Sequence, residues 1–150
     1  MKEHSAHAPS TIYWPGRLSA LLPLVLFIGA AFQVPEIQKN GAMAMAFDWV
    51  PSLNVRFDLV LDGLSLLFVL IITGVGFLVT LYADAYLAGH RQMNRFFVYL
   101  QSFLLSMVGL VLSNNLILLF VFWELTTLFS FLLIGFENES ATARDSARQA

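Results

Sequence analysis

The chain has 150 residues, of which 58% are hydrophobic and only 12% are charged. Globular domains carry about 25% charged residues, so the polar residues here are too few to cover the surface of a soluble domain. The 10 acidic and 8 basic residues nearly balance, which offers no basic surface for nucleic acid. The chain has no cysteine, which excludes disulfides, thiolate metal sites and a cysteine nucleophile. Together with a mean hydropathy of +0.73, these values place the chain in a membrane.

Four apolar stretches of the sequence are predicted to cross the bilayer as helices. A span needs about 17–25 residues, and lipid cannot satisfy the hydrogen bonds of an open backbone. The predicted fold class is an all-α membrane protein, a helix bundle with a single membrane domain over residues 1–150. The helices are expected at about residues 16–34, 62–84, 95–113 and 115–136. A signal peptide is an alternative for the first stretch, but Pro23 and the lack of a small-residue cleavage site argue against it.

The connections between these helices predict how the chain is oriented in the membrane. Residues 35–61 are expected to form a mixed polar loop outside the cell, with a short extended piece at 54–58, and residues 137–150 a cytoplasmic tail. Six of the eight basic residues lie on the side of the two termini: Lys2, Arg17, Arg91, Arg95, Arg144 and Arg148. Because cytoplasmic loops carry an excess of Lys and Arg, both termini are predicted to be cytoplasmic in a multi-pass protein of the cell (inner) membrane.

One ionisable residue is predicted to lie in the middle of the membrane. Glu124 falls well inside the fourth apolar stretch, where a charge costs about 2.5–3.5 kcal/mol on an insertion scale. Protonation, a partner or water has to offset that cost. Glu124 is therefore a candidate for proton exchange. The alternative is a protonated glutamic acid that hydrogen-bonds to a neighbouring helix and only holds the bundle together.

Three further polar residues are candidates for a path taken by ions. Thr127 lies one helical turn after Glu124, and Ser130 continues a polar stripe on the same helix. Asp62 comes just before the second apolar stretch, where a carboxylate can accept hydrogen bonds from the first N–H groups of the helix. We expect that capping role for Asp62, with a gating carboxylate at the outer mouth as the alternative.

No pattern in the sequence indicates a cofactor, a metal site or an enzymatic reaction. The pair Gly74 and Gly76 lies within an apolar stretch, where close helix packing is expected rather than a nucleotide-binding loop. The histidines lie in flanks or loops, and no Ser-His-Asp set is visible. A proton relay chains several ionisable groups, and this chain supplies one within the membrane. We therefore expect neither an enzyme nor a complete pump.

Several runs of residues resemble the antiporter-like membrane subunits, over roughly residues 48–136. This group includes the large A subunit of Mrp-type multisubunit Na⁺/H⁺ antiporters and the distal proton-pumping subunit of respiratory NADH:quinone oxidoreductase. The runs are Phe57 to Phe68, Ile72 to Gly76, Arg95 to Leu100, Asn114 to Leu116, Phe122 to Thr127 and Ser130 to Phe136. The sequences Trp123-Glu124-Leu125-Thr126 and Trp49-Val50-Pro51-Ser52-Leu53 are more similar to the Mrp protein.

The resemblance implies a helix bundle in which the carboxylate that matches Glu124 pairs with a lysine on a later helix and gates proton movement. It also implies sister membrane subunits, and exchange of H⁺ for Na⁺ or another monovalent cation. Members of the family have well over ten helices, so we expect the chain to be an N-terminal fragment without that lysine. Two alternatives stay open: a proton-pumping arm subunit of an NADH:quinone oxidoreductase, and a small structural membrane protein without transport activity.

Overall fold

The computed structural model describes residues 15–50, 55–87 and 93–136, which form four long helices and one β-hairpin. The helices are α1 (Pro15–Asn40), α2 (Gly63–Tyr86), α3 (Met93–Leu112) and α4 (Leu116–Ile134). The hairpin consists of β1 (Ala42–Val50) and β2 (Val55–Asp62). Each of the four helices is long and apolar enough to cross a membrane. The predicted class, an α-helical membrane bundle, is confirmed.

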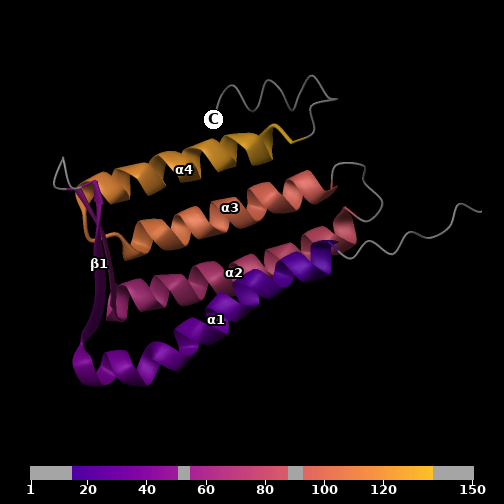
Figure 1. Cartoon of the computed structure of the whole chain (residues 1–150). Helices are drawn as coiled ribbons and strands as arrows, with labels where there is room; N and C mark the ends of the chain where they lie inside the picture. Colours follow the sequence, from indigo (N-terminus) through magenta and orange to yellow (C-terminus); the bar gives the residue numbers. More distant parts are fainter. Residues whose placement is uncertain (1–14, 51–54, 88–92, 137–150) are drawn as a thin grey trace, which may run out of the picture.

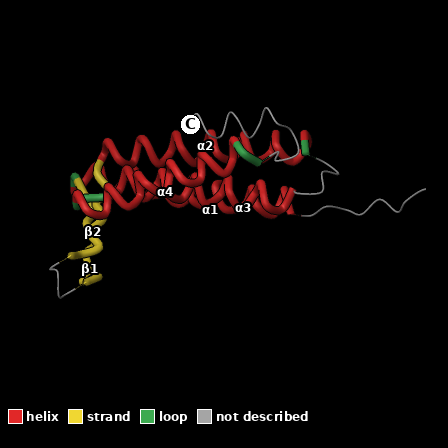
Figure 2. The backbone as a smooth tube through the Cα atoms, turned by 90° about the horizontal axis from the view of Figure 1, so that it is seen from above, coloured by secondary structure: helices red, strands yellow, loops and turns green. Residues whose placement is uncertain are grey.

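The four helices lie side by side, and successive helices run in opposite directions (Figure 1). The hairpin stands across one end of the bundle, next to the start of α2, the end of α3 and the start of α4 (Figure 1), and Figure 2 shows it projecting sideways from that end. We call this the hairpin end. At the opposite end, Arg17 of α1 forms an ion pair with Asp84 of α2 at 3.7 Å.

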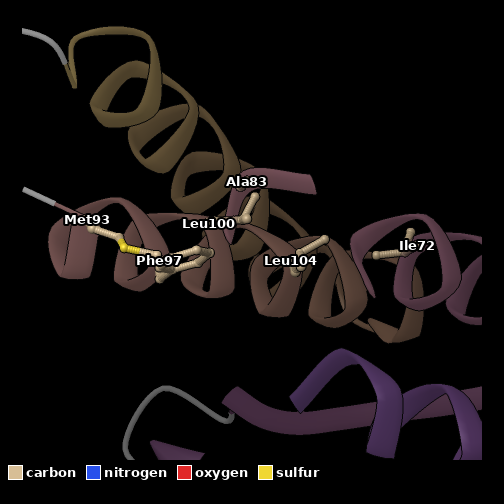
Figure 3. Packing of buried hydrophobic residues seen from close by; sticks show 6 residues of the cluster. All are labelled: Ile72, Ala83, Met93, Phe97, Leu100 and Leu104. Atoms are coloured by element: carbon tan, nitrogen blue, oxygen red, sulfur yellow. The ribbon is translucent and has the colours of Figure 1, made fainter. Parts of the chain in front are cut away.

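Two clusters of buried apolar side chains hold the helices together. The first lies between α2 and α3 and consists of Ile72, Ala83, Met93, Phe97, Leu100 and Leu104 (Figure 3). The second joins α1 to α2 and consists of Ala30, Ile37, Leu66 and Val69. In lipid, such clusters stabilise a bundle through van der Waals packing rather than through removal of apolar surface from water.

Glycines allow the helices to approach one another closely. A Cβ atom on Gly76 of α2 would lie 2.7 Å from the side chain of Leu104 on α3. A Cβ atom on Gly109 of α3 would overlap the ring of Phe122 on α4, and Gly74 is in similar close contact with α1. The packing role expected for Gly74 and Gly76 is therefore the one that the structure shows.

The segment expected to be a loop, residues 35–61, is largely folded. Helix α1 continues through Pro35 and changes direction in its last turns (Figure 1), because a proline inside a helix removes a hydrogen bond and kinks the helix without always ending it. The helix ends where Gly41 adopts a φ of 78°, which favours glycine, and donates its N–H to the carbonyl of Ile37 at 2.8 Å.

The remainder of that segment forms the hairpin. Strands β1 and β2 pair antiparallel, with Phe47 opposite Phe57, and the two rings stack at a centroid distance of 4.9 Å. The extended piece expected at 54–58 overlaps β2. Strand β1 was not expected, because its alternating Ala and Met residues are apolar on both faces and do not show the usual contrast between a buried and a solvated face. The expected tail, residues 137–150, lies outside the described residues.

Candidate functional site

Glu124 lies near the middle of α4, and its side chain is exposed on the surface of the bundle. Within the apolar 18-residue stretch of α4, only 6% is buried inside the bundle, against 39% of the corresponding stretch of α2. Within residues 15–50, 55–87 and 93–136, no group donates a hydrogen bond to the Glu124 carboxylate or forms an ion pair with it. A carboxylate in this position faces lipid unless water or another protein segment covers it.

The other charged residues of the described chain lie at the ends of the helices or in the hairpin. Arg17 and Asp84 form the ion pair noted above, and Arg95 in the first turn of α3 donates to the hydroxyl of Tyr99 at 2.6 Å. On the hairpin, Arg56 lies 3.4 Å from Asp48. Among the described residues, Glu124 is thus the one charged group placed well inside a membrane-spanning helix.

Thr127 and Ser130 lie on a groove between α3 and α4. The groove has a volume of about 340 Å³, and its other lining residues are Phe103, Met107, Leu110, Thr126 and Phe131. The hydroxyl of Thr127 donates to the carbonyl of Trp123 at 3.2 Å, so its oxygen is free to accept from a group in the groove. Glu124 does not line this groove. The structure therefore groups Thr127 with Ser130 but places Glu124 on an adjacent face of α4.

Asp62 caps the start of α2. Its Oδ1 atom accepts a hydrogen bond from the backbone N–H of Ser65 at 2.8 Å, while its own backbone N–H donates to the Ser65 hydroxyl at 2.8 Å. The backbone N–H of Ser65 and then the Ser65 hydroxyl, which also donates to Oδ1 at 2.8 Å, hold the pKa of the Asp62 carboxyl below its usual value. This is the capping geometry expected from the sequence. Within the described residues, no hydrogen bond joins Asp62 to α4, and a gating role for this carboxylate stays a prediction.

One polar contact inside the bundle was not singled out from the sequence. The side-chain amide of Gln101 on α3 donates to the hydroxyl of Thr80 on α2 at 3.3 Å. Thr80 is fully buried. The Oε1 atom of Gln101 is also buried, and it has no hydrogen-bond partner among the residues that the structure describes. Such an acceptor costs about 1–3 kcal/mol when it stays unpaired. A lone Gln in an apolar stretch is the only signal in the sequence, and it does not identify the partner helix.

The described residues contain no group of three His, Asp or Glu side chains that could hold a metal ion. What the arrangement offers is one ionisable group within the apolar helix α4, a groove lined by Thr127 and Ser130 on an adjacent face, and a buried amide–hydroxyl contact between α2 and α3. Such groups can bind and release protons or contact ions and water, which is the chemistry of transport pathways in membrane proteins.

Known proteins that are similar to this chain include subunits of cation/proton antiporters. Over 129 residues the chain is 47% identical to the A/B subunit of a probable K⁺/H⁺ antiporter from Rhizobium meliloti (strain 1021), an alignment that covers 86% of this chain and 13% of the relative. It is 49% identical over 125 residues to the A subunit of a Na⁺/H⁺ antiporter from Alkalihalophilus pseudofirmus, covering 81% of this chain and 16% of the relative. The chain is a homologue of antiporter A subunits.

Two further findings agree with this homology. The structure matches one chain of the Mrp complex from Dietzia sp. DQ12-45-1b with a TM-score of 0.67 and 34% sequence identity, over 79% of this chain and 13% of that one. Residues 48–97 match the family model described as NADH-Ubiquinone oxidoreductase (complex I), chain 5 N-terminus. The resemblance to antiporter-like membrane subunits is confirmed. This homologue is a multi-pass membrane protein and spans about an eighth to a sixth of the length of the relatives cited.

Proposed function

We propose that the chain is part of the A subunit of a multisubunit cation/proton antiporter, in which Glu124 exchanges protons within the membrane. The antiporter names of the relatives support the first half of the proposal, and they indicate Na⁺ or K⁺ as the cation. Exchange of ions across a membrane requires no covalent chemistry, so we propose that the chain acts as a transporter component and not as an enzyme. Sister membrane subunits are the proposed partners.

The observation that carries the role of Glu124 is a carboxylate in the middle of α4 that has no partner in the described part of the chain. The other charged side chains of the described residues lie at helix ends or in the hairpin, where water reaches them. Placing a charged glutamate in the middle of the membrane costs about 2.5–3.5 kcal/mol of insertion free energy. Ionisable residues in such positions typically function in transport. A protonated Glu124 removes this cost, and a cation or basic side chain from outside the described residues would remove it for the charged form.

Thr127 and Ser130 support a path beside this carboxylate. Both residues line the groove between α3 and α4, on a face of α4 adjacent to the one that carries Glu124. Hydroxyl groups can both donate and accept hydrogen bonds, so they can hold water or contact a partly dehydrated cation. We also propose that the hairpin end faces outward, because six of the eight basic residues are expected on the other side.

A second candidate function is a proton-pumping arm subunit of an NADH:quinone oxidoreductase, which the family model matching residues 48–97 favours. The two functions differ in what drives proton movement. An antiporter moves protons when Na⁺ or K⁺ is added, without NADH. A respiratory complex moves protons when NADH is oxidised, whichever monovalent cation is present.

The test uses inverted membrane vesicles from cells that express the chain with its sister subunits. A preformed pH gradient should collapse when Na⁺ or K⁺ is added without NADH, and Glu124→Gln should slow this response at least about ten-fold while the complex still assembles. Asp48→Asn, which neutralises an exposed carboxylate of the hairpin, is the matched control and should leave the response unchanged. A pH response that requires NADH would favour the respiratory alternative. An unaltered cation response in Glu124→Gln would remove Glu124 from the mechanism.

A further inference from the structure

The contact between Gln101 and Thr80 leaves the Oε1 atom of Gln101 without a hydrogen-bond donor among the described residues. The single hydroxyl proton of Thr80 is donated to the carbonyl of Gly76 at 2.7 Å, so the Thr80 oxygen can only accept another hydrogen bond. The group that faces it must therefore be the NH₂ of Gln101, as the 3.3 Å contact shows. This orientation turns Oε1 of Gln101 away from Thr80, and no group within residues 15–50, 55–87 and 93–136 donates a hydrogen bond to this buried atom.

Gln101 also lines a groove between α1 and α3. The groove has a volume of about 380 Å³ and is lined by Ser19, Asn94, Phe97, Val98, Gln101, Ser102 and Leu105. Asn94 lies in the first turn of α3, and Leu105 is about 16 Å further along the helix axis. The groove thus starts at the end of the bundle opposite the hairpin, where Arg17 pairs with Asp84, and reaches about the middle of α3.

A second groove of comparable size has a different character. It has a volume of about 480 Å³ and lies between α1 and α2, lined by Leu24, Phe27, Leu70, Ile71, Gly74, Val75, Phe77 and Leu78. Its lining contains no polar side chain. An apolar space stays dry, whereas a space with several polar groups around it can hold water. The two grooves therefore allow a comparison within one molecule.

We propose that the groove between α1 and α3 is a water-filled inlet, and that a water molecule at its inner end donates a hydrogen bond to Oε1 of Gln101. Water supplies the donor that this acceptor lacks, and buried waters commonly satisfy such groups. Three further residues with polar side chains, Ser19, Asn94 and Ser102, line this groove on the way from the charged end of the bundle. The inlet leads water from the end of the bundle opposite the hairpin, along α3, to about the middle of the membrane. It does not depend on the role proposed for Glu124.

Thiol labelling in membrane vesicles tests the inlet, because the chain has no cysteine of its own. A charged methanethiosulfonate reagent reacts with a thiolate, which forms where water is present and not in lipid. Ser102→Cys replaces a groove residue with one of nearly the same size. Leu78→Cys, an exposed position in the apolar groove, is the matched control, and Ser106→Cys, which is buried, reports any general opening of the bundle.

The proposal requires Ser102→Cys to react at least about ten-fold faster than Leu78→Cys, with Ser106→Cys unreactive. It also requires Ser102→Cys and Asn94→Cys to be labelled from the same side of the membrane. Silver ion, which is small enough to follow water into narrow spaces, should react with Gln101→Cys. Equal rates for Ser102→Cys and Leu78→Cys would overturn the inlet. A Gln101→Cys variant that is inert to silver ion would overturn the water site at its inner end.

Discussion

Asn114, in the turn between α3 and α4, is hydrogen-bonded to Asp58 of β2 at two points. Its backbone N–H donates to the carbonyl of Asp58 at 3.0 Å, and its side-chain amide donates to Oδ2 of Asp58 at 3.0 Å. A bridge between Leu59 and Ser113 lies next to this contact. Hydrogen bonds between residues far apart in the sequence therefore hold the hairpin against the helices, and the position of the hairpin depends on the α3–α4 turn.

Asn114→Ala should loosen the hairpin without unfolding the helices. The change removes the side-chain bond to Asp58 and keeps the backbone bond, and a hydrogen bond of this kind contributes about 0.5–1.5 kcal/mol. Hydrogen–deuterium exchange of the β2 amides should become several-fold faster. Asn40→Ala is the control, because the side chain of Asn40 donates to Glu36 within α1 and, among the described residues, contacts no group of the hairpin through a hydrogen bond. Equal exchange of β2 in both variants would show that Asn114 does not hold the hairpin.

Gly109→Ala should weaken the packing of α4 on α3. The added methyl group would overlap the ring of Phe122, so that α4 or the ring must move, at a cost of about 1–3 kcal/mol in the free energy of unfolding. Gly29→Ala is a matched change in α1, where nothing lies within 4 Å of the added atom, and it should be neutral or stabilise by up to about 1 kcal/mol. Thermal unfolding in detergent measures both. Equal effects would contradict the close α3–α4 contact.

The cap at Asp62 predicts a dependence of stability on pH. Because its pKa is lowered in the folded state, the folded chain binds this proton less readily than the unfolded chain. The stabilisation is complete above the ordinary pKa of an aspartate, about 4, and is lost as the pH falls through the lowered pKa. Asp62→Asn keeps a capping side chain but has no proton to bind, so its stability should fall less in acid than that of the unmodified chain.

Ser65→Ala separates the contribution of the Ser65 hydroxyl to this cap from that of the Ser65 backbone N–H. It removes the hydroxyl but keeps the backbone N–H that donates to Asp62, which is the largest cause of the lowered pKa. Most of the acid dependence should therefore remain in Ser65→Ala, measured as the change in melting temperature between neutral and acidic pH. An acid dependence of Asp62→Asn equal to that of the unmodified chain would contradict this account of the cap.

The sequence predicted the helices of the bundle better than the segment that joins the first two. A long apolar run in lipid forms a helix, because a helix satisfies the backbone hydrogen bonds within one segment. The four helices therefore follow from the four apolar runs of the sequence. Pro35 marks a probable helix end in a sequence, yet here α1 continues to Gly41, whose backbone conformation ends the helix. The hairpin depends on contacts such as Asn114 with Asp58, which no local pattern in either segment reveals.

Only part of the candidate site could likewise be predicted from the sequence. The sequence predicts Glu124 inside the fourth apolar helix with Thr127 one turn later, and both residues do lie in α4, while the position of Glu124 within the membrane stays a prediction. The exposure of Glu124 and the groove at Thr127 depend on how α4 packs against α3. The contact between Gln101 and Thr80 could not be predicted, because nothing local to either residue indicates which faces of α2 and α3 meet.

The role proposed for Glu124 is that of the proton-exchanging group of this chain. The most direct measurement is the initial rate of the pH change that Na⁺ or K⁺ produces in inverted vesicles, divided by the amount of assembled complex. Loss of a group that transfers protons lowers rates by about 10²–10⁴-fold, so Glu124→Gln should reduce this rate by at least about ten-fold, while Asp48→Asn retains it. A Glu124→Gln complex that assembles normally and keeps the full rate would contradict the account.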